Sequence, residues 1–121
     1  MRIFKNTWFS RFADREGITD SELAETVTRL EAGNSDTDLG SGVYKVRLAR
    51  TGEGKAKGYR VIVFYKSEER TFFVYAFAKA NRGNINEKEL RDYKKDAKFN
   101  LSITDEQIKD YLRKRTWIEV L

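Results

Sequence analysis

The chain has 121 residues, of which 36 % are charged and 13 % aromatic, and its formal net charge is +5. It contains no cysteine and no histidine, which excludes disulfides, cysteine-ligated zinc and a histidine base or metal ligand. No window approaches ~18 consecutive apolar residues, so no membrane span is expected. Charged residues appear at once, at Arg2 and Lys5, so no secretory signal is expected. We therefore expect one compact cytoplasmic domain over residues 1–121, with no metal or other cofactor.

The first part of the chain predicts a short strand and a helix. Residues 2–8 are expected to form an edge strand. Apolar side chains then recur at helical spacing, at Trp8, Phe9, Phe12 and Ala13. This pattern predicts a brief helix that ends near Gly17.

A second helix has clearer boundary signals. Thr19 is placed to cap it, with Glu22 as the capping-box partner, and Ile18 is placed to pack onto Leu23. Its buried stripe is expected to be Leu23, Val27 and Leu30. Residues 32–41 are rich in turn formers and predict a polar loop.

Three strands are expected next, over residues 43–50, about 59–66 and about 71–79. Along the first strand, apolar and basic side chains alternate between two faces, with Tyr44, Val46 and Leu48 on one and Lys45 and Arg47 on the other. Residues 67–69 predict a hairpin between the second and third strands. The three strands should therefore form an antiparallel meander.

The C-terminal part predicts two more helices. Asn84 or Asn86 is expected to cap the first of them, which runs to about Lys98. The last helix should begin at Thr104, with Gln107 in the capping-box position. Residues 117–121 predict a short strand or a packed tail.

Positive charge is concentrated in the predicted strands. Residues 42–82 hold ten Lys or Arg and three Asp or Glu, a local charge of +7, whereas residues 1–41 sum to −3 and residues 83–121 to +1. A basic surface built on a sheet is typical of proteins that bind a phosphate backbone. The alternative is that Lys45 and Arg47 belong to a solvated sheet face, as charged strand residues often do.

The glycine-rich segment 52–58 does not fit the known nucleotide-binding loops. A Walker loop requires glycine where Ala49 stands and Ser or Thr where Ala56 stands, and the dinucleotide fingerprint requires glycine at Lys57. Two interpretations stay open: a flexible basic hairpin loop, or a loop that embraces a nucleic-acid backbone.

Two other groups favour structural roles. Asp36 and Asp38 lack further ligands at metal-binding spacing and are interpreted as turn residues. The stripe Phe73, Tyr75 and Phe77 is interpreted as core rather than as a base-stacking platform.

The run from Gly42 to Leu90 resembles the RelE/ParE superfamily of bacterial toxins, most closely its HigB-like RelE branch. The segments that carry the resemblance are GVYKVRLAR, GEGKAKGYRVIVFY, FVYAFAKANRGNI and ELRDYKK. The resemblance implies an α+β fold, with helices packed on a twisted antiparallel sheet of three to five strands. It also implies an mRNA interferase, a toxin that binds mRNA on the ribosome, cuts it and so inhibits translation, with a cognate antitoxin as partner.

The resemblance also implies roles for single residues. Arg60 matches the phosphate-binding arginine of the family, Lys55 and Lys57 match its loop lysines, and Lys79 and Arg82 match a second cationic cluster. The expected RNA-binding residues are Lys45, Arg47, Arg50 and Lys57. The C-terminal tyrosine or histidine of many relatives has no match, and Tyr111 and Trp117 are the nearest candidates.

A ribonuclease can use the RNA 2′-hydroxyl as its nucleophile, so the protein only has to position the phosphate, move two protons and neutralise charge. We expect Lys55 or Lys79 to transfer a proton, and Arg60 and Arg82 to hold the phosphoryl oxygens. The alternative is a toxin or binder without enzymatic activity, either a ParE-type gyrase inhibitor or a basic RNA-binding module.

Overall fold

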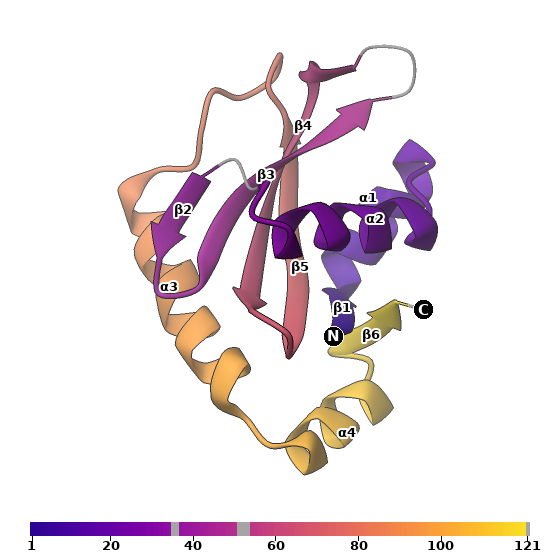
Figure 1. Cartoon of the computed structure of the whole chain (residues 1–121), viewed down its shortest axis with the longest axis vertical. Helices are drawn as coiled ribbons and strands as arrows, with labels where there is room; N and C mark the ends of the chain where they lie inside the picture. The colour runs from indigo at the N-terminus through magenta and orange to yellow at the C-terminus, as the bar shows by residue number, and fades with distance from the viewer. Residues whose placement is uncertain (35–36, 51–53, 121) are drawn as a thin grey trace.

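The computed structural model describes residues 1–34, 37–50 and 54–120, and for residues 50 and 54–57 it describes the backbone alone. The described residues form four helices and one six-stranded sheet (Figure 1). The strands are β1 (Arg2–Asn6), β2 (Thr37–Gly40), β3 (Val43–Arg50), β4 (Gly54–Lys66), β5 (Arg70–Ala78) and β6 (Trp117–Val120). The helices are α1 (Thr7–Glu16), α2 (Asp20–Glu31), α3 (Glu87–Ser102) and α4 (Asp105–Arg113).

The strand order is β2-β3-β4-β5-β1-β6, and β1 runs parallel to β5 while the other neighbours are antiparallel. The predicted α+β class and the meander β3-β4-β5 are confirmed. The upper limit of five strands was too low, because residues 32–41, predicted to be a polar loop, contain the short edge strand β2. The prediction that the first strand lies at an edge was also wrong, since β6 pairs with the outer side of β1.

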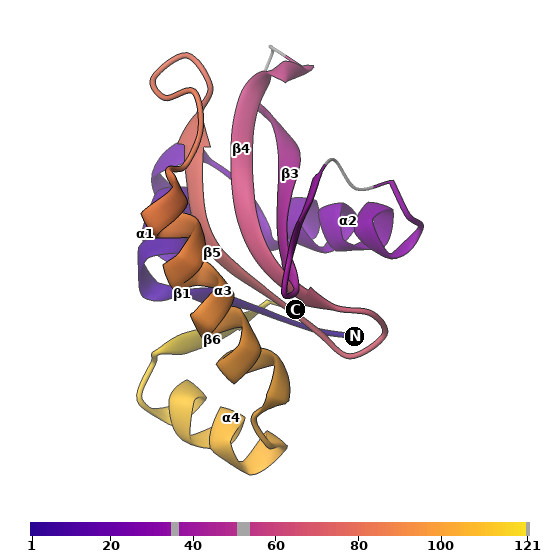
Figure 2. The same ribbon diagram turned by 90° about the vertical axis from the view of Figure 1, so that its left-hand side faces the viewer.

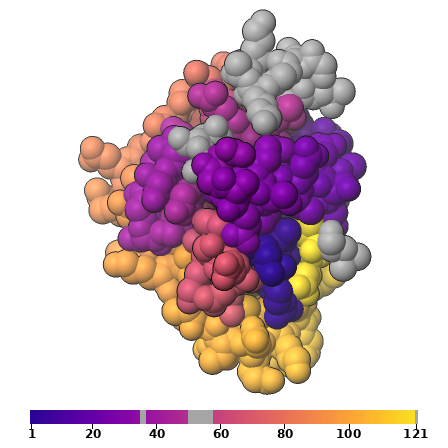
Figure 3. Space-filling view, viewed as in Figure 1, coloured from indigo at the N-terminus to yellow at the C-terminus, as the bar shows by residue number. Residues whose placement is uncertain are grey.

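The helices lie on both sides of the sheet (Figure 2). One core contains α1 and α2 side chains packed on Val46, Val61 and Val63, and the other lies under α3 and α4 around Ile62 and Phe64. Figure 3 shows α2 lying across the near face, with α4 and the end of α3 at the lower end of the molecule. No helix in the described part of the chain is long and apolar enough to cross a membrane.

Helix α1 covers the part of the β5 edge that is not paired with β1. Strand β1 pairs only with residues Arg70–Phe73 of β5, so the upper part of β5 has no neighbouring strand on that side. Helix α1 lies along this part, and Trp8 contacts Tyr75 with 4.8 Å between ring centroids, while Phe9 contacts Phe73 at 5.3 Å. The helix therefore covers a strand edge that would otherwise be open.

Several predicted helix ends are confirmed by their caps, but α3 continues to Ser102 rather than ending near Lys98, and α1 begins at Thr7, within the strand expected over residues 2–8. Asn6 caps α1, and Gly17 ends it in the left-handed conformation with φ of 72°. The Thr19 hydroxyl accepts a hydrogen bond from the Glu22 amide at the start of α2. Thr104 and Gln107 form the predicted capping box of α4. Of the two candidates at α3, Asn86 is the cap.

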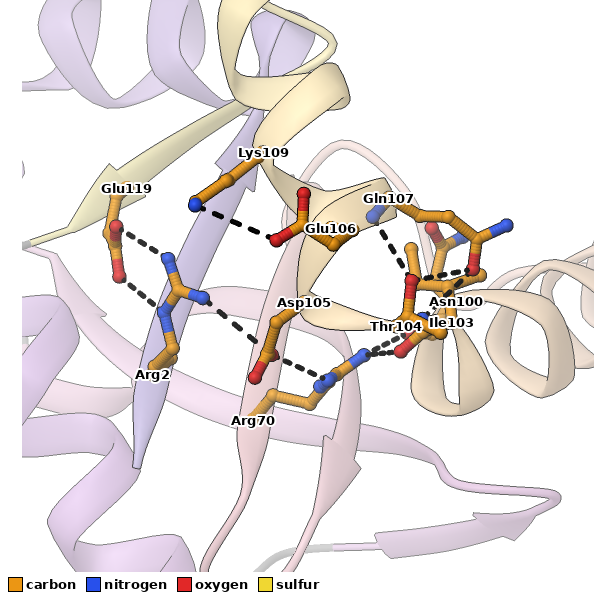
Figure 4. A network of polar contacts seen from close by, with 10 residues as sticks. All are labelled: Arg2, Arg70, Asn100, Ile103, Thr104, Asp105, Glu106, Gln107, Lys109 and Glu119. Atoms are coloured by element: carbon orange, nitrogen blue, oxygen red, sulfur yellow. Dashed lines mark hydrogen bonds and ion pairs between the residues drawn. The ribbon is translucent and has the colours of Figure 1, made fainter.

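A buried arginine holds the junction of α3 and α4 (Figure 4). Arg70 is only 9 % exposed, and its Nη1 donates to the backbone oxygens of Ile103 at 2.8 Å and Asn100 at 3.2 Å. Its Nη2 lies 3.4 Å from the Asp105 carboxylate. Carbonyls at a helix C-terminus have no partner within the helix, so Arg70 satisfies groups that the fold would otherwise bury unpaired.

Substitution of Gly42 should test how closely α3 packs on the β2–β3 turn. Gly42 has φ of +84°, and an added Cβ would lie 2.4 Å from the Leu101 Cδ1 atom. We expect Gly42→Ala to lower the free energy of unfolding by about 2–3 kcal/mol, from backbone strain and overpacking together. Urea denaturation measures this loss.

Gly33→Ala is the matched control, because Gly33 also has φ of +84° but no atom within 4 Å of the added Cβ. Only the backbone strain should remain, about 1 kcal/mol. Equal losses in the two variants would show that the contact with Leu101 has no energetic weight.

Candidate functional site

Three of the predicted cations lie on one face of the sheet. In the β3–β4 pairing Arg47 stands directly opposite Arg60, and Lys45 stands opposite Ile62, two residues along. Because alternate side chains of a strand share a face, Lys45, Arg47 and Arg60 all project to the side covered lower down by α3. We call these three residues the basic face.

The members of the basic face differ in exposure. Arg47 is exposed and Lys45 is half-buried, whereas Arg60 is only 7 % exposed. On β5, Phe77 stands opposite Arg60. Arg60 is thus largely buried in the sheet, whereas the Arg47 side chain reaches solvent. Placing several cations on adjacent strands favours the binding of an anion there.

Arg82 lies next to this surface, but its guanidinium already binds groups of its own loop, of β5 and of α3. Its Nε donates to the Asn84 backbone oxygen at 2.8 Å, its Nη1 donates to the Tyr75 hydroxyl at 3.1 Å, and its Nη2 pairs with Glu89. The guanidinium carbon also lies 5.7 Å from the centres of the Tyr75 and Phe77 rings. A phosphate that binds Arg82 must share the guanidinium with the Glu89 carboxylate.

The contact between Arg82 and Glu89 shifts the pKa values of both side chains. The hydrogen bond to Glu89 raises the pKa of Arg82, and the same guanidinium lowers the pKa of the Glu89 carboxyl. Glu89 is also the capping-box partner of Asn86, whose amide donates to it at 2.9 Å. One carboxylate therefore ties the 79–86 loop to the start of α3.

Two further contacts connect this loop to the strands. Lys45 Nζ lies 3.3 Å from the Asn84 Oδ1 atom, so the loop reaches the basic face. The Lys79 amide donates to the Gly58 backbone oxygen at 3.5 Å, and the Lys79 side chain is exposed. Lys79 therefore follows the end of β5 close to the β4 residue pair Tyr59 and Arg60.

Some predicted residues lie outside the described side chains. Lys55 and Lys57 belong to β4, which starts at Gly54 rather than near residue 59, but the structure describes only their backbone. The same holds for Arg50, whose backbone pairs with Gly54. The interpretation of residues 52–58 as a basic loop falls largely in this part of the chain and stays a prediction.

A family comparison matches almost the whole chain. The family model described as "RelE toxin of RelE / RelB toxin-antitoxin system" matches residues 1–120. The chain belongs to the RelE toxin family. It is therefore a toxin of a toxin-antitoxin system, with an antitoxin as its partner. No curated protein sequence matches it, and its assignment to the HigB-like branch stays a prediction.

The C-terminal aromatic residues of this RelE-family toxin do not join the basic face. Trp117 packs on Phe72, with ring centroids 4.6 Å apart, and its Nε1 donates to Asn100. Phe72 and Phe77 are five residues apart on β5, about 17 Å along a strand. Tyr111 belongs to the core cluster under α3 and α4. Both residues therefore pack under α3 and α4 rather than beside the basic face.

Sequence reasoning missed two residues of the site. Tyr75 was assigned to the core with Phe73 and Phe77, and those two are buried, but Tyr75 is half-buried and its hydroxyl accepts from Arg82. A bulge at Ile62 and Val63 places Phe73 and Tyr75 in opposite cores. Glu89 was missed as the partner of Arg82, although its spacing from Asn86 is a capping-box signal. Asp38, interpreted as a turn residue, lies in β2, where its carboxylate accepts from the Gly40 amide at 2.9 Å, and Asp36 lies outside the described residues.

Glu89→Gln tests whether the Arg82–Glu89 ion pair stabilises the fold, through the pH dependence of the free energy of unfolding. A carboxyl whose pKa is lowered on folding contributes stability that is present above its unfolded pKa, near 4.5, and lost as the pH falls through the folded value. We expect the wild type to lose stability between about pH 5 and 3 more steeply than Glu89→Gln does. Urea denaturation at a series of pH values measures the two slopes.

Glu87→Gln is the control, since Glu87 is an exposed residue of the same first turn of α3. It should keep the acid dependence of the wild type. Parallel curves for the wild type and Glu89→Gln would show that the Arg82 contact does not stabilise the fold.

Proposed function

We propose that this toxin is a ribosome-dependent endoribonuclease that cuts mRNA in the cytoplasm and so inhibits translation. The observation that carries the proposal is the basic face, where Arg47 and Arg60 stand opposite each other and Lys45 follows on the same side. Membership in the RelE family supports the same conclusion. The substrate is mRNA bound to the ribosome, and no metal takes part in the proposed reaction.

The proposed chemistry uses the RNA 2′-hydroxyl as the nucleophile. It attacks the adjacent phosphorus while the 5′-oxygen of the next nucleotide leaves, so one proton is removed and one is donated. Arg60 would hold a phosphoryl oxygen through its planar fork of N–H donors, because guanidinium matches phosphate geometry. Preorganised charge of this kind lowers the barrier most where negative charge develops in the transition state.

The other cations would bind the strand on both sides of the cut. Lys45 and Arg47 are placed to contact neighbouring phosphates, and we assign the same role to Arg50 and Lys57. Proton transfer is assigned to Lys79 or Lys55. A lysine that serves as a base must be neutral, and neighbouring positive charge favours the neutral form. Arg82 would supply a second clamp in competition with Glu89.

Mapping of messenger ends by primer extension after induction of the toxin tests the proposal. New 5′ ends within translated regions, absent when translation initiation is blocked, are the expected result. Breaks in DNA without cut messages would instead indicate a gyrase inhibitor of the ParE type. Salt-dependent RNA binding without new ends would indicate a plain RNA-binding module, and both outcomes would refute the nuclease.

A further inference from the structure

A cavity of about 230 Å³ lies between α3 and the strands β4, β5 and β6. Its apolar walls are the buried side chains of Phe64, Val74 and Trp117 and the half-buried ring of Tyr93. Among the described residues it shares none with the basic face. Its volume is below the range of sites for drug-sized ligands, about 300–1,000 Å³, so it is suited to a group of the size of one side chain.

The two amide side chains that line the cavity are bound within the protein. Asn6 caps α1 and donates to the Val74 backbone oxygen at 3.0 Å. Asn100 accepts from the Trp117 Nε1 atom at 3.3 Å and donates to the Asp96 backbone oxygen at 2.9 Å. These contacts fix both amides and the Trp117 ring, so the walls of the cavity are preformed.

The Asp96 carboxylate also lines the cavity, and no hydrogen bond or ion pair joins it to another described residue. Partial burial raises the pKa of Asp96, and the charge of Asp92, one turn earlier on α3, raises it further. Asp92 itself pairs with Lys88 at 3.2 Å. Asp96 is therefore a carboxylate that loses part of its hydration without a cation to compensate.

Aromatic rings and a carboxylate together favour a cation. The faces of aromatic rings attract ammonium and guanidinium groups. Three such rings line this cavity, those of Phe64, Tyr93 and Trp117. Arginine suits the combination best, because its planar guanidinium stacks on aromatic rings and also donates to a carboxylate. A neutral or anionic group would leave Asp96 without a partner.

We propose that this cavity receives an arginine side chain of the antitoxin. The toxin has an antitoxin as its partner. The cavity has the size of one side chain, and Asp96, which is exposed at its edge, supplies the charge that complements arginine. Arginine is among the residues that most often dominate the energy of protein interfaces. The proposal goes beyond the nuclease and does not depend on it, since antitoxin binding requires no cleavage.

Fluorescence of Trp117 reports on the cavity, because Trp117 lines it. The chain has two tryptophans, so Trp8→Phe leaves Trp117 as the only one. N-acetyl-arginine amide should change this fluorescence saturably, with a Kd on the order of 1 mM, as expected for a ligand of so few atoms. N-acetyl-citrulline amide has the same shape without the charge and should bind at least about fivefold more weakly. Equal binding of the two compounds would overturn the proposal.

Asp96→Asn, made in the same Trp8→Phe background, should bind the arginine compound about fivefold more weakly through the loss of one ion pair. Asp92→Asn is the matched control, because it removes the same charge one turn away and Asp92 does not line the cavity. It should bind the compound as the background protein does. Equal losses in the two variants would indicate a general electrostatic attraction and overturn the proposal.

The stability of Asp96→Asn without a partner is a second readout. This variant removes a partly buried charge and its repulsion with Asp92, and it breaks no contact with a described residue. Its midpoint in urea denaturation should therefore be higher than that of the wild type. A lower midpoint would overturn the proposal, because Asp96 would then serve the fold of the toxin itself.

Affinity for the cognate antitoxin identifies the source of the cation. In calorimetric titrations Asp96→Asn should bind the antitoxin about tenfold more weakly than the wild type, and Asp92→Asn should bind it normally. When the arginines of the antitoxin are replaced by alanine one at a time, one replacement should weaken the wild-type complex as much. The same replacement should have a clearly smaller effect on the Asp96→Asn complex, because the two groups form one contact.

Wild-type antitoxin affinity in Asp96→Asn would overturn the proposal. If the arginine compound still bound in an Asp96-dependent manner, the cavity would be a site for a small organic cation instead. Arginine replacements whose losses all add fully to that of Asp96→Asn would overturn the proposal as well, since no arginine of the antitoxin would then contact Asp96.

Discussion

Replacement of Arg60 by alanine is expected to reduce messenger cleavage by about 10²–10³-fold, the usual cost of removing one preorganised donor to a developing charge. Arg60 is 7 % exposed and stands between Arg47 and Phe77 in the sheet. In the proposed reaction its planar fork of N–H donors binds a phosphoryl oxygen. Cells that express Arg60→Ala without antitoxin should therefore grow, while the wild type stops growth.

Two further variants separate charge from geometry at this position. Arg60→Lys keeps the charge but offers a point donor in place of a planar fork, so most of the activity should still be lost. Arg113→Ala removes one exposed arginine from α4, at the far end of the molecule, and should stay fully toxic (Figure 1). Circular dichroism and urea denaturation of Arg60→Ala must show a folded protein. A folded variant that remains as toxic as the wild type would remove Arg60 from the site.

The second large effect is on stability, at Arg70. Arg70→Ala removes three contacts at once and leaves the Ile103 and Asn100 carbonyls, at the end of α3, without their donor. Burying an unsatisfied polar group costs about 1–3 kcal/mol, so we expect a total loss of about 2–4 kcal/mol in the free energy of unfolding. Urea denaturation monitored by Trp117, which is buried near this junction, measures the loss.

Arg2→Ala is the matched control in the same network. Arg2 binds Glu119 through two hydrogen bonds of 2.9 and 3.0 Å, but its side chain is 40 % exposed, so its removal should cost less than about 1 kcal/mol. Arg70→Met, which keeps the apolar stem, should lose nearly as much as Arg70→Ala because the carbonyls stay unpaired. Equal losses for Arg2→Ala and Arg70→Ala would contradict the role of buried carbonyls.

Local signals in the sequence predicted the elements with strong periodicity. The alternation of Tyr44, Val46 and Leu48 with Lys45 and Arg47 predicted β3 with the bounds that the structure has. The pair Thr104 and Gln107 predicted the start of α4, because capping requires only contacts between neighbours in the chain. Gly17 ended α1 for the same local reason.

Features that depend on distant residues were not predictable in this way. Strand β1 lies inside the sheet because Ile3 pairs with Val120, and a pairing across so many residues leaves no periodic signal. Strand β2 has only four residues, exposed or half-buried, so it lacks the apolar alternation that marks a strand. The position of α1 beside β5, which leaves Trp8 exposed, depends on where β1 stops pairing.

In the candidate site, too, local features could be predicted from the sequence and long-range ones could not. Lys45 and Arg47 could be placed on one face from sequence alone, but the position of Arg60 opposite Arg47 depends on the register between β3 and β4. The ion pair of Arg82 with Glu89 was missed, because a cationic cluster implied by resemblance gives no information about the acids that compete for it. Tyr75 was missed because the bulge inserts Val74 into β5 and so places Phe73 on the opposite face of the sheet from Tyr75.

The salt dependence of RNA binding shows directly whether the basic face contacts phosphates. Each contact to a single strand contributes about 0.7 to the slope of log affinity against log salt concentration. The double variant Lys45→Ala, Arg47→Ala should therefore lower the slope by about 1.4. The double variant Lys109→Ala, Arg113→Ala, which removes the same charge from α4, should keep the wild-type slope. If the Lys45 and Arg47 variant kept the wild-type slope and affinity, RNA would bind elsewhere on the protein and the basic face would not be its binding site.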